Sequence, residues 1–455
     1  MRPMSFTLGS FRRFGDVWAL RVPTQPAGFV ITGHPDHLRS LLTSDPGDAP
    51  SLTGESPLRP ILGPNSILTS TGARHLRQRR LLLPPFHGEA VARYVEAIVE
   101  VADREIDRWP VGEPFALAPR MQAVTLEVIM RGVFGIEGET APGTIEHRMR
   151  QTIRRLLGAS TSPLFTLVEM RNAGRREPRD LLALMLKIVD RQMYAVIAQR
   201  RAGSGGRGDD VLSLLLAARD DEGSPLSDRE LRDELMSLVL AGHETTANAL
   251  AWTVERLLHT PAAYDRLRSA VRDRGGTAEE GAPARAYVEA TIHEGMRSRP
   301  VIPMIVRRVT RPWRFGEYVV PAGTPVAVSI IGIHHRSDVY PEPHRFAPER
   351  FLDDGGADGA GRDDRAVGGD IRAARFHKPG TYTWIPFGGG IRRCLGATLA
   401  MAEQRVVLEA IARRTDLALA GPVTAAGPGE SPRMRNVTMI PRHGVPVTVT
   451  HRRPG

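Results

Sequence analysis

One helical pattern, running from Arg229 to Leu258, is long enough to decide the architecture of the whole chain. Ser227 and Glu230 precede its apolar core with the spacing of a capping box, and Pro261 follows its end. A helix of about 30 residues would be about 45 Å long, enough to cross a whole domain. Because its middle is almost wholly apolar, we expect a buried central helix.

The rest of the chain is also mostly helical in pattern, for example over Asp180 to Arg200. Short β-like stretches (VWALRV, GFVITG, TPVAVSI and PVTVT) lie near the start and in the last third. No internal repeat or long linker divides the chain. The sequence therefore predicts one mainly α domain over residues 1–455 with a minor β region. Polar stretches at 201–210, 273–285 and 353–370 are expected to be surface loops, the last of them a mobile insertion.

Cysteine content and charge narrow the class of protein. One cysteine among 455 residues excludes an intramolecular disulfide, which fits a reducing compartment. The N-terminus lacks the apolar run of a signal peptide, and no stretch approaches the ~18 apolar residues that span a bilayer. We therefore expect a cytoplasmic protein without a transmembrane segment. The formal charge of +10 is spread over short arginine doublets and aromatic residues are only 5%, so nucleic-acid binding is not predicted.

The long helix carries polar residues in its middle, AGHETT, where a core helix should be apolar. Buried Glu244 would cost several kcal/mol if ionised and unpaired, so it must face water, find a partner or stay protonated. Thr245 can bond back to a carbonyl one turn earlier, and Gly242 leaves room for water or a ligand to open the helix groove. A polar patch where the helix reaches the surface is the simpler alternative. A zinc-protease motif is excluded, because Ala247 stands where its second histidine should be.

A possible ion-pair cluster joins two distant motifs. Glu294 and Arg297, in HEGMR, lie three apart on one helical face, where an exposed pair would add only ~0.2–0.5 kcal/mol. Arg350, in APERF, follows a proline-rich stretch that cannot be helical and could bring a second guanidinium to Glu294.

A basic helical face is predicted near residue 75. TGARHLRQRRLLLPPFH places His75 and Arg79 four apart, and Pro84 and Pro85 end the helix. A solvated basic face is the simplest interpretation. If these groups point inward, they need an anionic ligand to neutralise them.

The only cysteine lies in FGGGIRRCLG. Pro386 to Gly390 cannot be regular helix or strand, whereas the sequence from Ala397 is helical, so Cys394 precedes a helix N-terminus. That terminus, with Arg392 and Arg393, favours a thiolate, and the glycines clear space for something large to approach the sulfur. Such a thiolate would be a nucleophile or a metal ligand, although a lone cysteine can also be an inert core residue. A phosphate-binding loop is disfavoured, because Arg393 occupies the third glycine position.

Together these four motifs resemble the cytochrome P450 family of haem-thiolate monooxygenases, in the same order and over essentially the whole chain. The resemblance implies the cytochrome P450 fold, with a long central helix over haem b (iron protoporphyrin IX) and Cys394 as the axial ligand of its iron. The loop matches the family at Phe387, Gly390, Arg392, Cys394 and Gly396. The roles that the resemblance implies are Phe387 packed beside the sulfur, His75, Arg79, Arg307 and Arg392 as propionate ligands, and Glu294, Arg297 and Arg350 as a buried structural cluster.

For the reaction, the resemblance implies that Glu244 and Thr245 deliver protons during oxygen activation, beside a water-opened groove at Gly242. The family often has Asp at the acid position, and Glu keeps the charge with a longer reach. The chain begins close to the family's first helix, at GSFRRFGDVW, without the proline-rich lead expected upstream.

Substrate and partners follow only in outline. The implied pocket walls are residues 52–70, 158–172 and Val239 to Thr245, together with Ile302, Met304 and a strand near Val437. Their apolar composition favours hydroxylation or epoxidation of a terpenoid, fatty acid or polyketide, with O2 as co-substrate. Electrons are expected from a separate ferredoxin or flavodoxin with its NAD(P)H-dependent reductase. The alternatives are a haem-thiolate peroxygenase or isomerase, a cysteine-nucleophile hydrolase, and a non-catalytic haem sensor or carrier.

Overall fold

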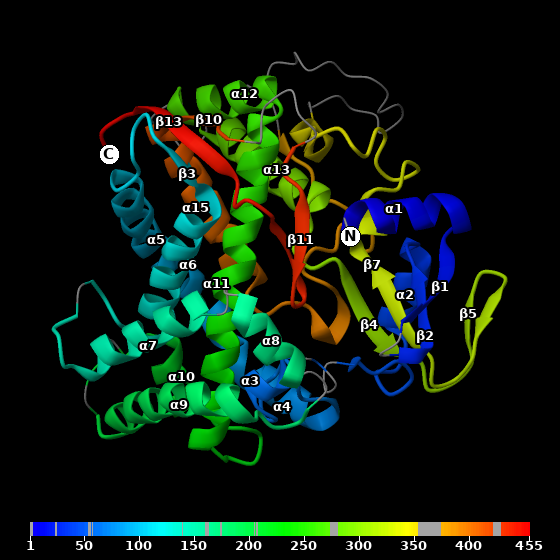
Figure 1. Ribbon diagram of the computed structural model, residues 1–455, viewed down its shortest axis with the longest axis horizontal. Helices are drawn as coiled ribbons and strands as arrows, with labels where there is room; N and C mark the ends of the chain where they lie inside the picture. The colour runs from blue at the N-terminus through cyan, green and yellow to red at the C-terminus, as the bar shows by residue number, and fades with distance from the viewer. Residues whose placement is uncertain are drawn as a thin grey trace.

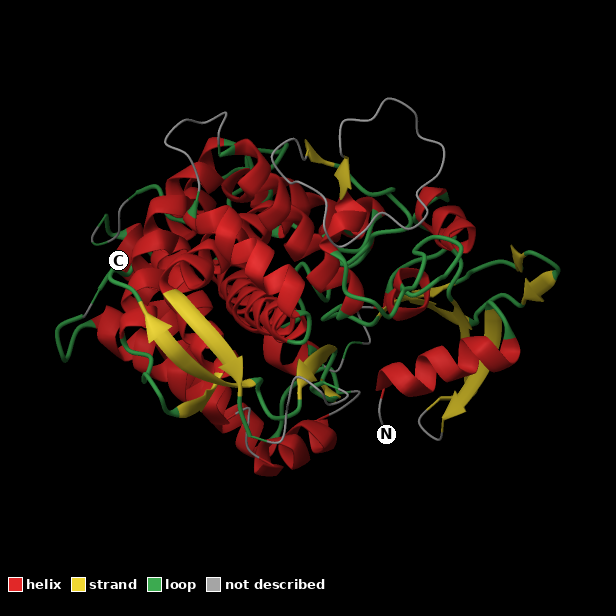
Figure 2. Ribbon diagram, turned by 90° about the horizontal axis from the view of Figure 1, so that it is seen from above, coloured by secondary structure: helices red, strands yellow, loops and turns green. Residues whose placement is uncertain are grey.

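The chain folds into a helix-rich body and a smaller part built around a sheet, side by side in Figures 1 and 2. The computed structural model describes residues 3–22, 25–52, 56, 58–138, 140–159, 163–172, 175–203, 205, 208–273, 281–353, 375–421 and 429–455. The predicted mainly α fold with a minor β region is confirmed. The insertion expected at 353–370 lies, except for Asp353, outside the described residues.

The helices follow one another in chain order. They are α1 (Pro3–Phe14), α2 (Pro35–Thr43), α3 (Arg59–Leu62), α4 (Gly72–Leu82), α5 (Glu89–Asp107), α6 (Leu117–Phe134), α7 (Ile145–Ala159), α8 (Pro163–Asn172), α9 (Asp180–Arg201), α10 (Val211–Ala217), α11 (Asp228–Leu258), α12 (Pro261–Arg272), α13 (Ala282–Ser298), α14 (Ile330–His334) and α15 (Ala397–Arg414). Short 3-10 helices are η2 (Pro84–Phe86), η3 (Pro348–Phe351) and η5 (Gly390–Arg392).

The strands form one four-stranded sheet and several smaller ones. They are β1 (Val17–Val22), β2 (Gln25–Thr32), β3 (Pro114–Ala116), β4 (Met304–Arg308), β5 (Trp313–Phe315), β6 (Tyr318–Val320), β7 (Pro325–Ser329), β8 (Leu352–Asp353), β9 (Arg375–Phe376), β10 (Thr415–Leu419), β11 (Pro432–Arg435), β12 (Thr438–Pro441) and β13 (Pro446–Arg452). The sheet orders are β1-β2-β7-β4 and β10-β13-β3, with pairs β11-β12, β5-β6 and β8-β9. In the largest sheet only the β2–β7 pairing is parallel.

Helix α11 is the central helix that the sequence predicts, and it runs through the helical body in Figure 1. The Ser227 side chain accepts the Glu230 N–H (3.3 Å) while Oε2 of Glu230 accepts the Ser227 N–H (2.9 Å), so the capping box is present. The C-terminal half of α11 packs in one apolar core with α5, α6, α13 and α15. Its N-terminal half packs in a second core with α6, α7, α9 and α10. Two cores therefore share α11 and α6, and this fixes both helices in place.

Local sequence patterns located most elements correctly. The helix predicted at Asp180 to Arg200 is α9, and the four β-like stretches fall on β1, β2, β7 and β13. The loop predicted at 273–285 is shorter than expected, because α13 begins at Ala282, and 274–280 lie outside the described residues. None of the helices in the described part of the chain has the length and apolarity that crossing a bilayer requires.

Candidate functional site

The cysteine loop is shaped by its glycines and by α2. Gly388 and Gly390 have φ of +66° and +62°, a region that favours glycine. A Cβ on Gly389 would lie 2.5 Å from Cδ1 of Leu42, so glycine is needed for α2 to approach the loop. At Gly389 and Gly390 the missing side chain makes room for Leu42 of α2.

The Cys394 thiol lies in front of α15, as predicted, but its surroundings do not favour a thiolate. The side chain is reached by solvent, yet it is deep enough that burial raises the pKa of the thiol. The Gly396 N–H, Arg79 and Arg393 oppose that rise without cancelling it, and Arg392 makes its contacts elsewhere. The predicted thiolate is thus not produced by the protein alone. A metal ion bound at the sulfur would deprotonate it outright.

Three arginines and a histidine from three elements gather near this loop. His75 and Arg79 come from α4, Arg307 from β4 and Arg392 from η5. Burial, and then repulsion by the three arginines, lowers the pKa of His75 to about 4. Burial, and then repulsion by Arg307 and Arg79, lowers the pKa of Arg392 to about 10. The residue patterns treated these four residues as separate motifs and only the family resemblance grouped them; the structure brings them close to one another.

No carboxylate pairs with these four residues in the described part of the chain. Their guanidinium hydrogen bonds go to backbone carbonyls: Arg79 Nη1 to Arg393 O (2.8 Å), Arg307 Nη1 to Val306 O (3.1 Å) and Arg392 Nη1 to Ile67 O (3.1 Å). Buried cations without a counter-ion are costly. The cluster therefore fits a ligand that brings anionic groups.

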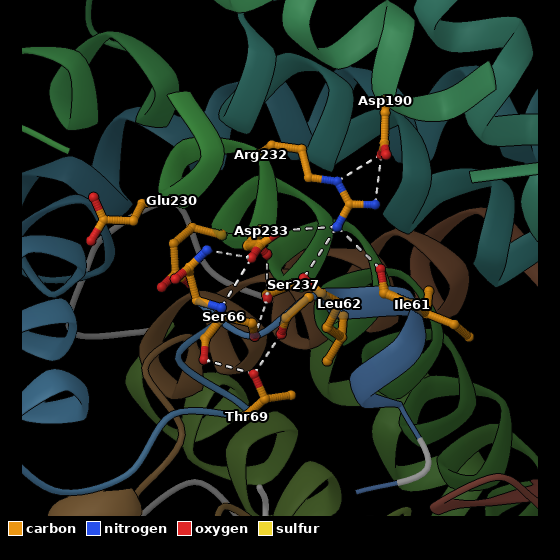
Figure 3. Close-up of polar contacts among 12 residues, drawn as sticks. Ile61, Leu62, Ser66, Thr69, Asp190, Glu230, Arg232, Asp233 and Ser237 are labelled. Atoms are coloured by element: carbon orange, nitrogen blue, oxygen red, sulfur yellow. Dashed lines mark hydrogen bonds and ion pairs between the residues drawn. The ribbon is translucent and has the colours of Figure 1, made fainter. Parts of the chain in front are cut away.

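The 63–70 loop connects Arg392 to α11, and sequence reasoning missed this connection. Figure 3 shows the α11 side of this network, with Ser66 and Thr69 of the loop near Asp233 and Ser237. Arg392 donates to the carbonyls of Ile67 and Ser70. From the other side, Oδ2 of Asp233 accepts the Asn65 backbone and side-chain N–H groups (3.0 Å each), and Oε2 of Glu234 accepts the Ile67 N–H (3.1 Å). The signal that could have revealed this connection was the run of three charged residues in an apolar helix, Arg232 to Glu234.

The acids of this network are held in different ways. Arg232 reaches Asp190 Oδ1 from Nε (2.7 Å) and Asp233 Oδ1 from Nη1 (3.0 Å). Glu234 is fully buried, its Oε1 has no hydrogen-bond partner among the described residues, and burial raises its pKa well above the ordinary value. Burial therefore favours the protonated form of Glu234. A side chain on Gly63, whose φ is +87°, would overlap the Asp233 carboxylate.

The AGHETT segment is helical throughout, so the predicted opening of the ladder at Gly242 is absent. A Cβ on Gly242 would lie 3.0 Å from Cδ1 of Ile129, and Thr125 Oγ1 donates to the His243 carbonyl (2.7 Å). Glycine is thus required where α6 packs against α11. Thr245 Oγ1 does bond back to the Ala241 carbonyl (2.6 Å), as expected.

Glu244 finds polar partners on the β11–β12 hairpin. Its Oε1 accepts from Thr438 Oγ1 (3.3 Å) and lies 3.5 Å from Arg435 Nη1. Burial raises the pKa of Glu244, against the opposing effects of Arg435 and Thr438. The sequence allowed Glu244 to face water, to find a partner or to stay protonated. The structure gives it partners, and its raised pKa favours the protonated form.

Glu294, Arg297 and Arg350 meet in one buried cluster. Arg297 donates from Nε and Nη2 to the two oxygens of Glu294 (2.6 and 2.8 Å), and Arg350 Nε lies 3.4 Å from Oε1. Arg297 Nη1 also donates to the His334 carbonyl (2.7 Å), and the His334 ring accepts the Ile385 N–H at Nε2 (2.9 Å). The cluster is thereby connected to the segment that enters the cysteine loop.

The remaining predicted residues lie in mixed environments. Phe387 is half-buried, with its ring 6.0 Å from Trp384, and its carbonyl accepts the Cys394 N–H (2.9 Å). Ile302 is half-buried, whereas Met304 is exposed. Val437 also is exposed, and it lies in the turn between β11 and β12.

A strand near Val437 is present as expected, since β11 ends at Arg435 and β12 begins at Thr438, and Val437 itself lies in the turn between them. One expectation about the pocket walls needs correction. Val239, placed in a pocket wall, is fully buried in the second core instead. Residues 53–55, 57 and 160–162 of the predicted walls lie outside the described residues.

Comparisons with known proteins agree with this arrangement. The family model for cytochrome P450 matches residues 2–424. Cytochrome P450 135A1 of Mycobacterium tuberculosis is 35% identical over 436 residues, which cover 95% of this chain and 88% of that one. Cytochrome P450 137 of the same organism is 36% identical over 442 residues, covering 96% and 83%.

Solved structures share the fold. A cyanobacterial cytochrome P450 with bound retinoic acid matches with a TM-score of 0.73 at 22% identity, covering 98% of this chain and 94% of that one. The haem domain of cytochrome P450DA matches with a TM-score of 0.76 at 21% identity, covering 99% and 94%. The fold and site define a haem-thiolate oxidoreductase. The chain belongs to the cytochrome P450 family, whose members bind haem b through a cysteine thiolate and act as monooxygenases.

Proposed function

We propose that Cys394 is the axial ligand of the haem iron and that His75, Arg79, Arg307 and Arg392 hold the two haem propionates. The observation that carries the proposal is the cluster of His75 with three guanidinium groups, none of which has a carboxylate partner among the described residues. Arg79 joins the cluster to the cysteine loop through its bond to the carbonyl before Cys394. Two carboxylates would neutralise the cluster as charge-assisted pairs.

Bound haem supplies oxygen activation and electron transfer, with the thiolate donating electron density to the iron. Within the chain, Phe387 holds the cysteine loop through its carbonyl, and the αL conformation of Gly390 turns the backbone toward Cys394. Burial raises the pKa of the Glu244 carboxyl and so favours its protonated form. Thr245 presents its hydroxyl one residue further along α11, so we assign proton delivery to these two residues. Gly242 serves this site by letting α6 support α11.

The proposed reaction is hydroxylation or epoxidation of an apolar small molecule of the terpenoid, fatty acid or polyketide type. Support comes from the side chains implied as pocket walls, since Ile302, Met304 and Val437 all retain exposed apolar surface. Glu294, Arg297 and Arg350 are assigned a structural role, because all three are fully occupied with one another and with backbone carbonyls.

In this proposal the chain is a single haem-binding domain in the cytoplasm. A separate ferredoxin or flavodoxin, reduced by its NAD(P)H-dependent reductase, delivers the electrons to the haem. Arg393, exposed beside Cys394, supports an acidic partner. Replacing Arg393 with Gln is expected to slow reduction by such a partner and to weaken its dependence on salt. An unchanged reduction rate and salt dependence would contradict this docking site.

The test of the central proposal is the absorption spectrum of the purified protein, oxidised and then reduced under carbon monoxide. A strongly red-shifted Soret band is expected in the wild type and should be lost in Cys394→Ser. For the propionate assignment, Arg392→Gln should release haem to an acceptor protein faster than the matched neighbour Arg393→Gln. If folded, haem-reconstituted wild type lacks the band, Cys394 must be tested as a nucleophile or an inert thiol.

A further inference from the structure

Two carboxyl groups from different helices meet at the turn of the β11–β12 hairpin. Asn436 Nδ2 donates to Oε1 of Glu169 on α8 (3.0 Å). Beside it, Arg435 Nη1 lies 3.5 Å from Oε1 of Glu244 on α11, and Thr438 Oγ1 donates to that same oxygen (3.3 Å). Figure 1 shows the lower end of β11 close to α8 and α11. The turn therefore connects the two helices through their carboxyl side chains.

Arg435 acts on both carboxyls. At Glu169, burial raises the pKa, Asn436 and then Arg435 oppose the rise, and the charge of Glu244 adds to it. At Glu244, burial also raises the pKa, and Arg435 and then Thr438 oppose the rise. One guanidinium thus faces two carboxyls whose negative charges repel each other. It stabilises the ionised form of either one more than it stabilises both together.

The other groups that face Glu244 leave this balance to Arg435. Burial, and then repulsion by Arg435, lowers the pKa of the neighbouring His243 to about 4, which favours the neutral ring. Helix α6 packs against this part of α11 through Ile129 and Thr125, neither of which titrates. His243 and α6 therefore bring no second positive charge to the two carboxyls.

Helix α8 depends on the turn for its position. Among the described elements it packs mainly on α9, and it joins the second core through Phe165. The bond between Glu169 and Asn436 is therefore a direct tie from α8 to the hairpin. If α8 moves away from the turn, this bond is lost and Arg435 is left with Glu244.

We propose that Glu169 is a positioning residue for Glu244: the two carboxyls compete for Arg435, so the place of α8 on the turn sets how firmly Glu244 keeps its proton. With α8 on the turn, Glu169 shares Arg435 and Glu244 retains its proton. With α8 displaced, Arg435 stabilises the Glu244 carboxylate and the proton passes to solvent. The inference rests on the proton delivery proposed for Glu244, and it makes that delivery depend on a helix of the implied pocket wall at 158–172.

The experiment follows the protonation of Glu244 by infrared spectroscopy of the haem-loaded protein over a pH series. The carbonyl stretch of its protonated carboxyl is isolated as the difference from Glu244→Gln. Glu169→Gln should move the midpoint of this band down by about half a pH unit, because Arg435 then serves Glu244 alone. Asn436→Gly suits the φ of +51° and should move it in the same direction. Arg435→Gln should move it up by about one pH unit.

Glu177→Gln and Arg433→Gln are the matched controls, because both side chains are exposed and Arg433 lies on the same strand as Arg435. Neither should move the midpoint. In the Arg435→Gln background, Glu169→Gln should have a smaller effect than in the wild type, because the guanidinium for which the carboxyls compete is gone.

The inference is overturned if Glu169→Gln leaves the midpoint unchanged or raises it, or if its effect is the same with and without Arg435. The infrared band is measured without turnover, so it tests the competition separately from the proposed reaction. Suppose that the midpoints move as expected while the variants divert no more reductant to peroxide than the wild type. That result would support the competition and contradict the proton delivery proposed for Glu244.

Discussion

His334 connects the Glu294 cluster to the cysteine loop, and this makes it a sensitive probe of the site. The ring is fully buried at the end of α14, where Nε2 accepts the Ile385 N–H (2.9 Å). Burial, and then repulsion by Arg297, lowers the pKa of His334 from 6.5 to about 3. The ring is therefore neutral at pH 7, as its acceptor role at Nε2 requires.

The free energy of unfolding depends on pH because the pKa of His334 differs between the folded and unfolded chains. The unfolded chain binds a proton at His334 near pH 6.5, whereas the folded chain resists until about pH 3. The stability that the neutral ring contributes is present above pH 6.5 and is lost as pH falls toward 3. The slope is at most about 1.4 kcal/mol per pH unit. Between pH 7.5 and pH 5.0, His334 alone should lower the free energy of unfolding by about 2 kcal/mol.

The assay is urea unfolding of the haem-loaded protein at these two pH values, for the wild type and His334→Gln. Glutamine can still accept the Ile385 N–H but does not titrate. We expect the variant to lose about 2 kcal/mol less on acidification than the wild type does, since all other groups cancel in the comparison. His451→Gln, at an exposed position, is the control and should behave as the wild type. Equal losses in the wild type and His334→Gln would refute the buried neutral ring.

Three other substitutions test the packing around the site. Burial raises the pKa of Glu255, but its contacts with His259 and Arg256 hold that pKa at about 2. Glu255→Gln should therefore lower the free energy of unfolding by about 3 kcal/mol at pH 7. Urea unfolding should show this difference shrinking as the pH falls from 4.5 toward 2. Gly295→Ala should lower the melting temperature, because its methyl would overlap the Thr253 hydroxyl, and Thr253→Ala should restore it. Glu234→Gln should retain haem as the wild type does, since the Gln side chain can still accept the Ile67 N–H, whereas Glu234→Leu loses this bond and should release haem faster.

Local signals predicted the fold well because they act over a few residues. Ser227 and Glu230 cap each other directly, so the start of α11 is fixed within one turn. Pro261 cannot continue a helix and begins α12 instead. The strand expected near Val437 is also present, as β11 and β12, and Asn436, with a φ of +51°, turns the chain between them.

Long-range contacts were predictable only where both partners stood out as charged residues. Arg350 was assigned to Glu294 because the cluster lacked a second guanidinium, and the two side chains do meet. The Asp233 contacts with Asn65 span 168 positions and involve a backbone N–H, which every residue possesses, so no pattern marks the partner. The raised pKa of Cys394 was missed because the sequence reveals nearby charges but not the burial that outweighs them.

The positive side chains behind the net charge of +10 lie in two kinds of environment, buried and exposed. Their response to salt differs. Near Cys394, Arg307 is buried and Arg79 and Arg392 are partly buried, so ionic screening reaches them less than it reaches Lys187 and Arg191, which are exposed on α9. Raising the ionic strength from about 0.1 M to about 1 M shortens the Debye length from about 10 Å to about 3 Å. The rate of haem release should therefore change little over this range. If haem release accelerates strongly, the propionate-binding cluster is open to solvent and the counter-ion argument for haem binding fails.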